Sequence, residues 1–296
     1  MIGKPHLSIV IANYNYGHFL EEAIRSILSQ GMGDEVEIIV CDAASTDNSV
    51  GVIKKFAKGL PPNTYLSQPQ PSTSTSITWW CSEKDGGQSA AFNKGFAHAK
   101  GDWFTWLNAD DILLPGTVKA FVRFVEKNPD AEWITGNMLS FDSDARKIIR
   151  VNWGPHYQPP LLMRNRSFNA VFGPTTFWRR SIYEKIGPID EKLHYAMDTE
   201  YWARMTMAGV KQYRLHHICW GFRSHSESKT VGLQTEEISA KREAETRYWK
   251  EKSGYQTKYI WYLFWVLWRF VDFSWLMRGI LKMKYEGKVL DKMFQC

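Results

Sequence analysis

The chain has 296 residues, of which 44% are hydrophobic and 23% charged, and its formal net charge is +6. These values are ordinary for a globular protein and exclude a largely disordered chain. The length allows one large α/β domain with an appendage, or two modest domains. The aromatic content of 15%, with 14 Trp, is high and indicates carbohydrate-stacking surfaces, contacts with a membrane interface, or both. The positive charge is compatible with a nucleotide or an anionic lipid surface but specifies neither.

Cysteine usage and the N-terminus indicate a cytoplasmic setting. The cysteines at 41, 81, 219 and 296 have neither zinc-binding nor disulfide spacing. A reducing compartment is the simplest explanation. The first residues lead directly into a strand-like run and lack the pattern of a signal peptide. No run of about 18 uninterrupted apolar residues exists, so no spanning helix is expected.

Short apolar runs alternate with helical patterns from the start of the chain. Residues 7–12 are typical of a buried parallel strand, and apolar residues at helical spacing follow over 18–30. A second strand is expected at 36–41 and a second helix over 50–56. This order predicts a parallel sheet with its loops at one edge. The Pro- and Ser/Thr-rich stretch 59–78 is expected to be a surface insertion.

The alternation continues after a glycine pair at Gly86 and Gly87. These glycines permit either close approach of the backbone to a ligand or a plain tight turn. The elements expected beyond them are a helix at 89–99, a strand at 103–107, a helix at 116–128, a strand at 131–138 and a hairpin over 141–151. No internal repeat is present.

An acidic stretch follows the strand expected at 103–107. It contains Asn108, Asp110 and Asp111, and Pro115 follows shortly after. Open α/β sheets bind ligands outside the carboxyl ends of their strands, and oxygen ligands at such a place suit Mg²⁺ or Mn²⁺. The alternative is an acidic turn that only caps the next helix.

Two further residues have open interpretations from local sequence. Asp198 lies at the start of an amphipathic pattern, either as an acid favoured by the helix N-terminus or as a general base facing a cleft. His225 lies in a polar loop after a strand-like segment, and a loop histidine alone indicates little.

The C-terminal part differs in composition from the rest. Residues 235–252 form a strongly charged helical pattern, and residues 259–268 are apolar all round. This second stretch is too short to span a bilayer. With the basic residues that follow, it suits a helix lying in an anionic lipid surface. The alternative is a helix buried against the rest of the chain or in a dimer interface. We expect a catalytic domain at 1–230 and a helical extension at 231–296.

Together the motifs resemble the family 2 glycosyltransferases, inverting enzymes of the GT-A fold, of the type that makes bacterial cell-surface polysaccharides. The resemblance covers roughly residues 7–230. It rests on residues 8–15, 26–30, 42–47, 82–88, 93–95 and 108–111, on Asp198 with Trp202 and Arg204, and on His225 with residues 228–230. It implies an α/β fold, in which a mostly parallel, Rossmann-like sheet of the nucleotide-diphospho-sugar transferase type is flanked by helices.

The resemblance also implies the roles of individual residues. Asp198 matches the catalytic base, and Asp110 with His225 would bind Mn²⁺ or Mg²⁺. The residues implied to contact the nucleotide-sugar donor are Ala12, Asn13, Tyr14, Asp42, Asp85, Gln88, Asn93, Asn108, Asp110 and Asp111. Asn108 replaces the first Asp of the family's DxD motif but keeps an oxygen acceptor. Ala43 stands where many members have an Asp that contacts uracil, so UDP is the favoured nucleotide rather than a fixed one.

The implied reaction is inverting hexosyl transfer to a hydroxyl of a glycan or a polyprenyl-linked saccharide. No nucleic-acid partner is expected. For the C-terminal helices, peripheral contact with the inner face of the cell membrane and oligomerisation stay open as alternatives. One alternative is a catalytically silent sugar-nucleotide binder or assembly subunit, which Asp110, Asp111 and Asp198 argue against. A nucleotidyltransferase is less favoured, because no glycine-rich basic phosphate loop occurs near the N-terminus.

Overall fold

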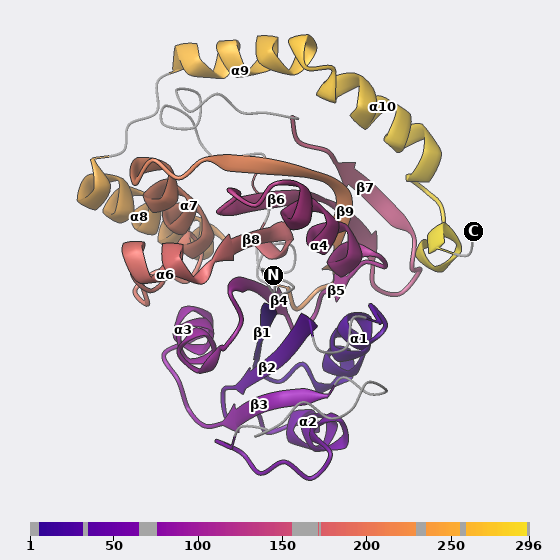
Figure 1. The fold of residues 1–296 in the computed structure, drawn as a ribbon, viewed down its shortest axis with the longest axis vertical. Helices are drawn as coiled ribbons and strands as arrows, with labels where there is room; N and C mark the ends of the chain where they lie inside the picture. The colour runs from indigo at the N-terminus through magenta and orange to yellow at the C-terminus, as the bar shows by residue number, and fades with distance from the viewer. Residues whose placement is uncertain are drawn as a thin grey trace.

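The computed structural model describes residues 6–31, 35–64, 76–155, 171, 173–228, 235–254 and 259–294. A 9-stranded sheet runs through these residues in the order β3-β2-β1-β4-β8-β6-β9-β5, with β7 paired to β6 (Figure 1). The strands are β1 (Leu7–Asn13), β2 (Val36–Asp42), β3 (Ile77–Ser82), β4 (Trp103–Asn108), β5 (Ile112–Leu113), β6 (Trp133–Asp142), β7 (Ile148–Asn152), β8 (Thr176–Arg179) and β9 (Gln212–Ser224).

Helices cover the sheet on both sides. They are α1 (Gly17–Leu28), α2 (Ser49–Ala57), α3 (Gln88–His98), α4 (Thr117–Lys127), α6 (Arg180–Ile186), α7 (Met197–Met207), α8 (Glu236–Ser253), α9 (Tyr259–Val271) and α10 (Ser274–Tyr285). Short 3₁₀ turns, η2 (Gly173–Thr175) and η3 (Leu290–Phe294), complete the described elements.

The strand directions confirm the predicted α/β fold with a mostly parallel sheet. Strand β1 is parallel to β2 and β4, and β2 is parallel to β3. Strand β8 is antiparallel to both β4 and β6, so β6 and its parallel neighbour β9 run in the same direction as β1 to β4. Strands β5, β7 and β8 run the opposite way.

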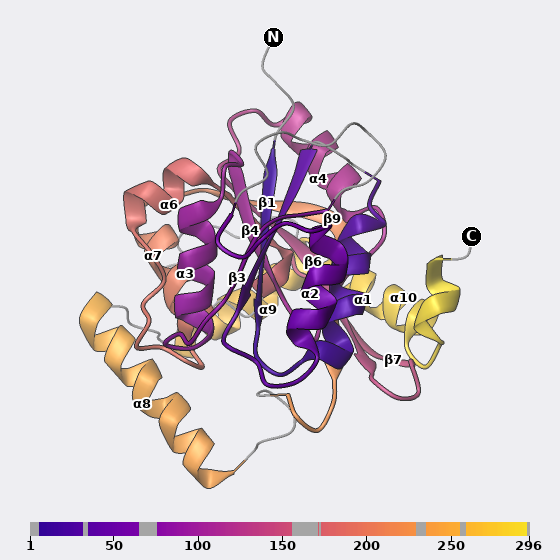
Figure 2. The ribbon, with the colours of Figure 1, turned by 90° about the horizontal axis from the view of Figure 1, so that it is seen from below.

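Alternation along β1 shows why its sequence is apolar almost throughout. Leu7, Ile9 and Ile11 are fully buried on the face covered by α1, α2 and α4. Val10 is equally buried on the opposite face, against α3, α6 and α7 (Figure 2). A strand covered on both faces has no solvated side, so it lacks the polar alternation of a surface strand.

Most elements expected from local pattern occur within a few residues of their expected bounds. The hairpin over 141–151 is present as the turn between β6 and β7. Strand β8 was not foreseen, because a four-residue run carries no periodicity of its own and its partners lie elsewhere in the chain. Residues 65–75 of the expected insertion and Cys296 lie outside the described residues.

The C-terminal end packs onto the sheet rather than standing apart from it. The backbone N–H of Ile148 donates to the carbonyl of Lys288 at 2.9 Å, and the N–H of Gly287 donates back to Ile148 at 2.8 Å. Leu290, 1% exposed, belongs to the core cluster that includes β7 residues. None of the helices in the described ranges is both long and apolar enough to cross a membrane.

Close packing of α3 on β1 generates a stability prediction. A Cβ atom at Gly95 would overlap the side chain of Val10, whereas a Cβ at Gly279 in α10 would meet no atom within 4 Å. Replacing a helical glycine by alanine ordinarily stabilises by about 0.5–1 kcal/mol. We expect Gly279→Ala to show that gain, and Gly95→Ala to lower the free energy of unfolding by roughly 1–3 kcal/mol through overpacking. Urea denaturation measures both; a gain for both variants would contradict the packing.

Candidate functional site

A cavity of about 990 Å³ opens beside the carboxyl ends of β1 and β4. Its size is within the range of pockets that hold small ligands. Many of the predicted site residues line it: Ala12, Asn13, Tyr14, Asp85, Gln88, Asn108, Asp110 and Asp198. The strand ends bring these residues together from widely separated parts of the chain, as expected for an open α/β sheet.

Asp42 lies behind the cavity wall and holds the loops that form it. It is 1% exposed and is not among the lining residues. Its carboxylate accepts hydrogen bonds from the Asn13 amide at 2.7 Å and from the hydroxyls of Ser45 and Ser82 at 2.5 and 2.6 Å. These contacts connect the ends of β1, β2 and β3. Asp42 therefore fixes the loops that form the wall, and its direct contact with a donor stays a prediction.

The acidic stretch after β4 divides into a fully buried residue, Asp111, and a partly exposed one at the cavity, Asp110. Asp111 is fully buried, and its carboxylate accepts from the Asn108 amide at 2.8 Å and from the Arg223 backbone N–H at 2.9 Å. Burial, with the neighbouring charge of Asp110, raises the pKa of Asp111 well above its usual value. Asp111 lies behind the wall, whereas Asp110 lines the cavity.

The hydrogen bonds of Asn108 explain the residue type at the head of this motif. Its Oδ1 accepts from the Gln88 amide at 2.8 Å, while its Nδ2 donates to Asp111. An ionised Asp cannot donate, and at position 108 it would face the buried carboxyl group of Asp111. The amide therefore fits this neighbourhood better than a carboxylate.

Asp110 and His225 form the candidate cation site. Asp110 Oδ2 and His225 Nε2 are hydrogen-bonded to each other at 3.1 Å, and their side chains are 13% and 7% exposed. Ligands about 2.1 Å from one metal and at right angles lie about 3 Å apart, so this spacing fits a shared Mn²⁺ or Mg²⁺. The His225 ring packs on Tyr16 and Phe19, with centroids 5.6 and 4.7 Å away.

This pair supplies only part of a coordination shell. Within the described ranges, no group of three or more metal-ligating side chains is found. Mg²⁺ sites in proteins commonly combine one or two carboxylates with substrate phosphates and water. Asp110 and His225 are thus compatible with a cation whose remaining coordination positions are filled by a bound phosphate ligand and water. His225 itself does not line the cavity.

Asp198 lies in the first turn of α7 and reaches the cavity wall. The N-cap of this helix is Ala196, so Asp198 is not the cap. Burial raises the pKa of Asp198, and hydrogen bonds from the Thr199 backbone and hydroxyl partly offset that rise. A partly buried carboxylate with a raised pKa, facing a cavity, is a better proton acceptor than a solvated one.

Asn93 lies away from the cavity wall, as Asp42, Asp111 and His225 do. Its amide oxygen accepts from the backbone N–H of Ile189, and its Nδ2 donates to the Ile189 carbonyl, both at 2.9 Å. It thereby ties α3 to the segment that precedes α7. Its predicted donor contact remains a prediction.

Several lining residues were not foreseen from the sequence. They include Trp106, Gly173, Pro174, His194, Tyr195, Trp220, Phe222 and Arg242. The two-residue spacing of Trp220 and Phe222 in β9 was an available signal for a shared face. Arg242 carried no such signal, because it lies in a charged helix whose exposed face resembles any solvated one.

A mostly parallel sheet with a cavity and an acidic strand tip at its carboxyl edge is an arrangement typical of nucleotide-binding α/β proteins. The sequence model described as "Glycosyltransferase like family 2" matches residues 5–239. The chain therefore belongs to this family.

Relatives and solved structures agree with this assignment. The chain is 33% identical over 189 residues to the uncharacterized glycosyltransferase alr2836 of Nostoc sp., which covers 62% of this chain and 54% of that protein. It is 25% identical over 230 residues to the putative glycosyltransferase EpsE of Bacillus subtilis, covering 77% of this chain and 76% of EpsE. The chain thus matches about half the length of the Nostoc relative.

Two solved structures share the fold at low sequence identity. S. aureus TarS 1-349 has a TM-score of 0.53 at 16% identity, covering 80% of this chain and 65% of TarS. Mannosyltransferase PcManGT from Pyrobaculum calidifontis, solved with GDP-Man and Mn²⁺, has a TM-score of 0.53 at 18% identity, covering 74% of this chain and 57% of that one. With the family match, these likenesses confirm the predicted GT-A fold.

The contacts of Asn108 predict the effect of restoring the family's carboxylate. We expect Asn108→Asp to lower the free energy of unfolding by roughly 1–3 kcal/mol, because Asp111 loses a donor and gains a carboxyl neighbour. Asn108→Ala loses the same donor without adding charge, so its loss should be smaller. Urea denaturation at neutral pH without divalent metal compares the two. An Asn108→Asp variant as stable as the wild type would contradict this account.

Proposed function

We propose that this glycosyltransferase moves a sugar, with inversion, from a nucleotide-diphosphate sugar to a hydroxyl of a glycan or polyprenyl-linked saccharide. The observation that carries the proposal is one cavity lined by both Asp110, at the strand tip, and Asp198, on α7. The diphosphate leaving group needs a carboxylate that binds a metal ion, and the acceptor hydroxyl needs a carboxylate that accepts its proton. TarS complexes with UDP and with UDP-GlcNAc, in the same fold, support a nucleotide-sugar donor.

The donor nucleotide fits the part of the cavity formed by the β1 and β2 loops. Tyr14, 60% exposed, and Thr46 line this part together with Ala43 and Ala44. An exposed tyrosine ring offers a stacking surface for a base or ribose. Two alanines at this wall provide no base-specific hydrogen bond from their side chains. UDP is therefore favoured as the donor nucleotide by the family resemblance rather than by a side-chain contact.

Asp110 and His225 would hold a divalent cation against the donor diphosphate. When bound, such a cation neutralises the charge that develops on the leaving group. Arg223 Nε donates to the Asp110 backbone carbonyl at 2.7 Å, and this hydrogen bond fixes the backbone at Asp110. The protein thereby presents its metal-binding carboxylate in a fixed position before the donor arrives.

Asp198 is the proposed general base. Its carboxylate accepts the acceptor's hydroxyl proton as the new glycosidic bond forms, and the nucleoside diphosphate departs from the opposite face of the sugar. Glu200, the nearby alternative, is 4% exposed and forms an ion pair with Arg204 at 2.7 Å. Because its carboxylate is paired with Arg204, Glu200 is the weaker candidate for the base.

A silent sugar-nucleotide binder or assembly subunit is the main alternative function, and a nucleotidyltransferase is the less favoured one. A silent binder would bind nucleotide without hydrolysing or transferring from any sugar nucleotide. A carboxylate at the cavity wall can bind a sugar hydroxyl in either kind of protein, so transfer from a sugar nucleotide is the observation that separates them.

Helices α9 and α10 are proposed to contact an anionic membrane surface. They form an arc along one edge of the molecule (Figure 1). Large apolar side chains on the arc are exposed, from 43% at Ile280 to 79% at Met283. The exposed members are Leu263, Phe264, Leu267, Phe270, Val271, Phe273, Trp275, Leu276, Ile280 and Met283.

The basic residues on these helices favour an anionic lipid surface as the partner of this exposed apolar face. Arg278, Lys282 and Lys284 lie on α10 beside the apolar residues, and Arg269 lies on α9. Apolar residues with basic neighbours suit a helix that inserts among anionic headgroups. Burial of this face against the rest of the chain does not account for its exposure, and a dimer interface is the remaining alternative from the sequence.

Asp198→Asn tests the proposed function. We expect the transfer rate from a UDP-sugar with Mn²⁺ to fall by about 10²–10⁴-fold, because the amide cannot accept the proton. Nucleotide affinity should stay unchanged, since the amide keeps the shape of the carboxylate. Asp130→Asn, at an exposed loop position, serves as the control. Wild-type transfer by the Asp198 variant would refute the base assignment.

The pH dependence of the wild-type rate is a further readout of the same experiment. The base must be ionised, and burial raises the pKa of Asp198. The turnover rate at saturating donor and metal should therefore fall as pH decreases, with a midpoint above the ordinary Asp value of about 4. This acidic limb should be absent from the residual rate of Asp198→Asn.

Vesicle binding tests the membrane contact. We expect sedimentation with phosphatidylglycerol-containing vesicles to exceed that with phosphatidylcholine alone. The double variant Leu267→Glu, Val271→Glu should bind these vesicles at least about tenfold more weakly, because each side chain loses its apolar burial. Met207→Glu, at an exposed apolar position on α7, is the matched control. Unchanged binding, or a dimer that the double variant dissociates, would overturn the membrane contact.

A further inference from the structure

Helix α8 packs against the segment that leads into α7 (Figure 1). Trp249 is 2% exposed and belongs to the core cluster that contains Leu193 and Ala196. Near the C-terminal end of α8, Lys252 and Tyr248 contact Asp190 Oδ2 at 2.8 and 3.2 Å. The helix is therefore fixed on the base-bearing side of the cavity by apolar and polar contacts together.

Glu245 lies one turn before these contacts on α8 and binds the backbone just before α7. Its Oε1 accepts from the N–H of His194 at 2.9 Å, and its Oε2 accepts from the N–H groups of Tyr195 and Ala196 at 2.7 and 3.0 Å. The N-cap, Ala196, makes no side-chain capping bond of its own. A carboxylate at this place satisfies backbone donors and interacts favourably with the positive end of the helix.

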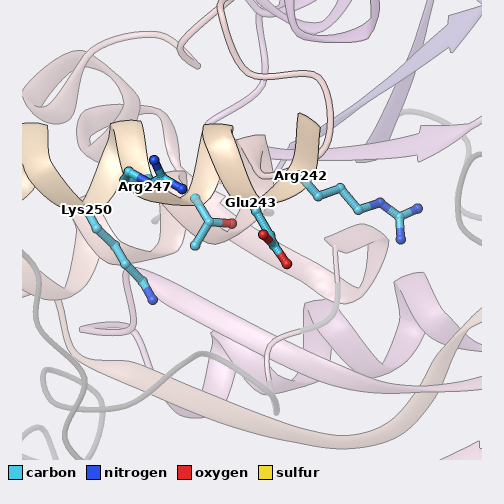
Figure 3. Close-up of a pocket in the computed structure, with 5 residues that line it drawn as sticks. Arg242, Glu243, Arg247 and Lys250 are labelled. Carbon is cyan, nitrogen blue, oxygen red and sulfur yellow. The ribbon is translucent and has the colours of Figure 1, made fainter. Parts of the chain in front are cut away.

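The segment held by Glu245 forms part of the cavity. His194, Tyr195 and Asp198 all line it. Arg242, one turn before Glu245, also lines the cavity, and its guanidinium lies 5.4 Å from the centre of the Tyr195 ring. Figure 3 shows Arg242 on α8 with Glu243, Arg247 and Lys250, which border a surface groove on the same helix. Helix α8 thus supplies one lining residue, Arg242, and through Glu245 it also holds the lining residues His194 and Tyr195.

We propose that Glu245 is a positioning residue that fixes the 194–196 segment and so holds Asp198 in its place at the cavity. The inference rests on the proposed role of Asp198 as the base. Asp198 follows Ala196 by only two residues and lies in the first turn of α7. A displacement of about 1 Å at a reacting group can lower a rate by about 100-fold, so a hydrogen-bonded support matters for the chemistry.

The experiment compares Glu245→Ala and Glu245→Gln with Glu251→Ala, an exposed glutamate on the same helix. We expect kcat of Glu245→Ala to fall by about 10- to 100-fold, while the donor KM and nucleotide Kd change less than about twofold. Glu245→Gln should lie between, since one of its oxygens still accepts. Glu251→Ala should behave as the wild type.

Hydrogen exchange supplies a readout that does not depend on activity. The amides of residues 194–196 should exchange faster in Glu245→Ala, and amides of β1 and β4 should be unchanged. A general loss of protection with unchanged kcat per folded molecule would mean that Glu245 only stabilises the fold, and would overturn the proposal. Unchanged exchange at 194–196 would overturn it as well.

The Asp198→Asn background separates this proposal from the proposed function. If Glu245 acts through Asp198, Glu245→Ala should lower the residual rate of Asp198→Asn by less than about twofold. An equal loss in both backgrounds would overturn the positioning role and leave the base assignment intact. Transfer that survives Asp198→Asn would instead refute the base assignment, whatever Glu245→Ala does.

Discussion

The buried carboxyl group of Asp111 is the constraint on which the site depends. A buried carboxyl group that lacks hydrogen bonds is strongly destabilising, so its partners must be provided by the fold. They come from Asn108 on β4 and from the backbone of Arg223 on β9. Satisfying Asp111 therefore joins the ends of two strands that are distant in sequence, and it leaves the adjacent Asp110 at the cavity. The position of Asp110 at the cavity thus follows from a structural requirement of its neighbour Asp111.

The same junction determines what surrounds the tip. Strand β9 brings His225 within 3.1 Å of Asp110, and Arg223 holds the Asp110 carbonyl. The Arg223 guanidinium also lies over the rings of Phe19 and Phe141, with centroids 4.7 and 4.9 Å away. Asp110 and His225 thus meet where β4, β9 and α1 come together, and their geometry depends on the sheet order more than on any local turn.

Sequence patterns predicted the parts of this protein that local periodicity determines. The strands β1, β2 and β4 and the helices between them follow from apolar spacing, and Asp110 and Asp198 follow from the family motifs. Patterns could not tell a lining residue from a supporting one: Asp42 and Asp111 face inward because of partners up to 112 residues away. The four-residue strand β8 and the contacts of Glu245 depend equally on pairing across the chain, which periodicity does not encode.

The cavity is lined by residues within the family match and by one residue of the C-terminal helix α8. The family match ends at residue 239, and every lining residue in the described ranges lies before it except Arg242. The walls around Tyr14 and Asp110 are therefore built within the shared fold. Helix α8, which reaches the segment before Asp198, lies mostly beyond the match. A change in α8 can therefore alter the surroundings of Asp198 without altering the residues that form the walls around Tyr14 and Asp110.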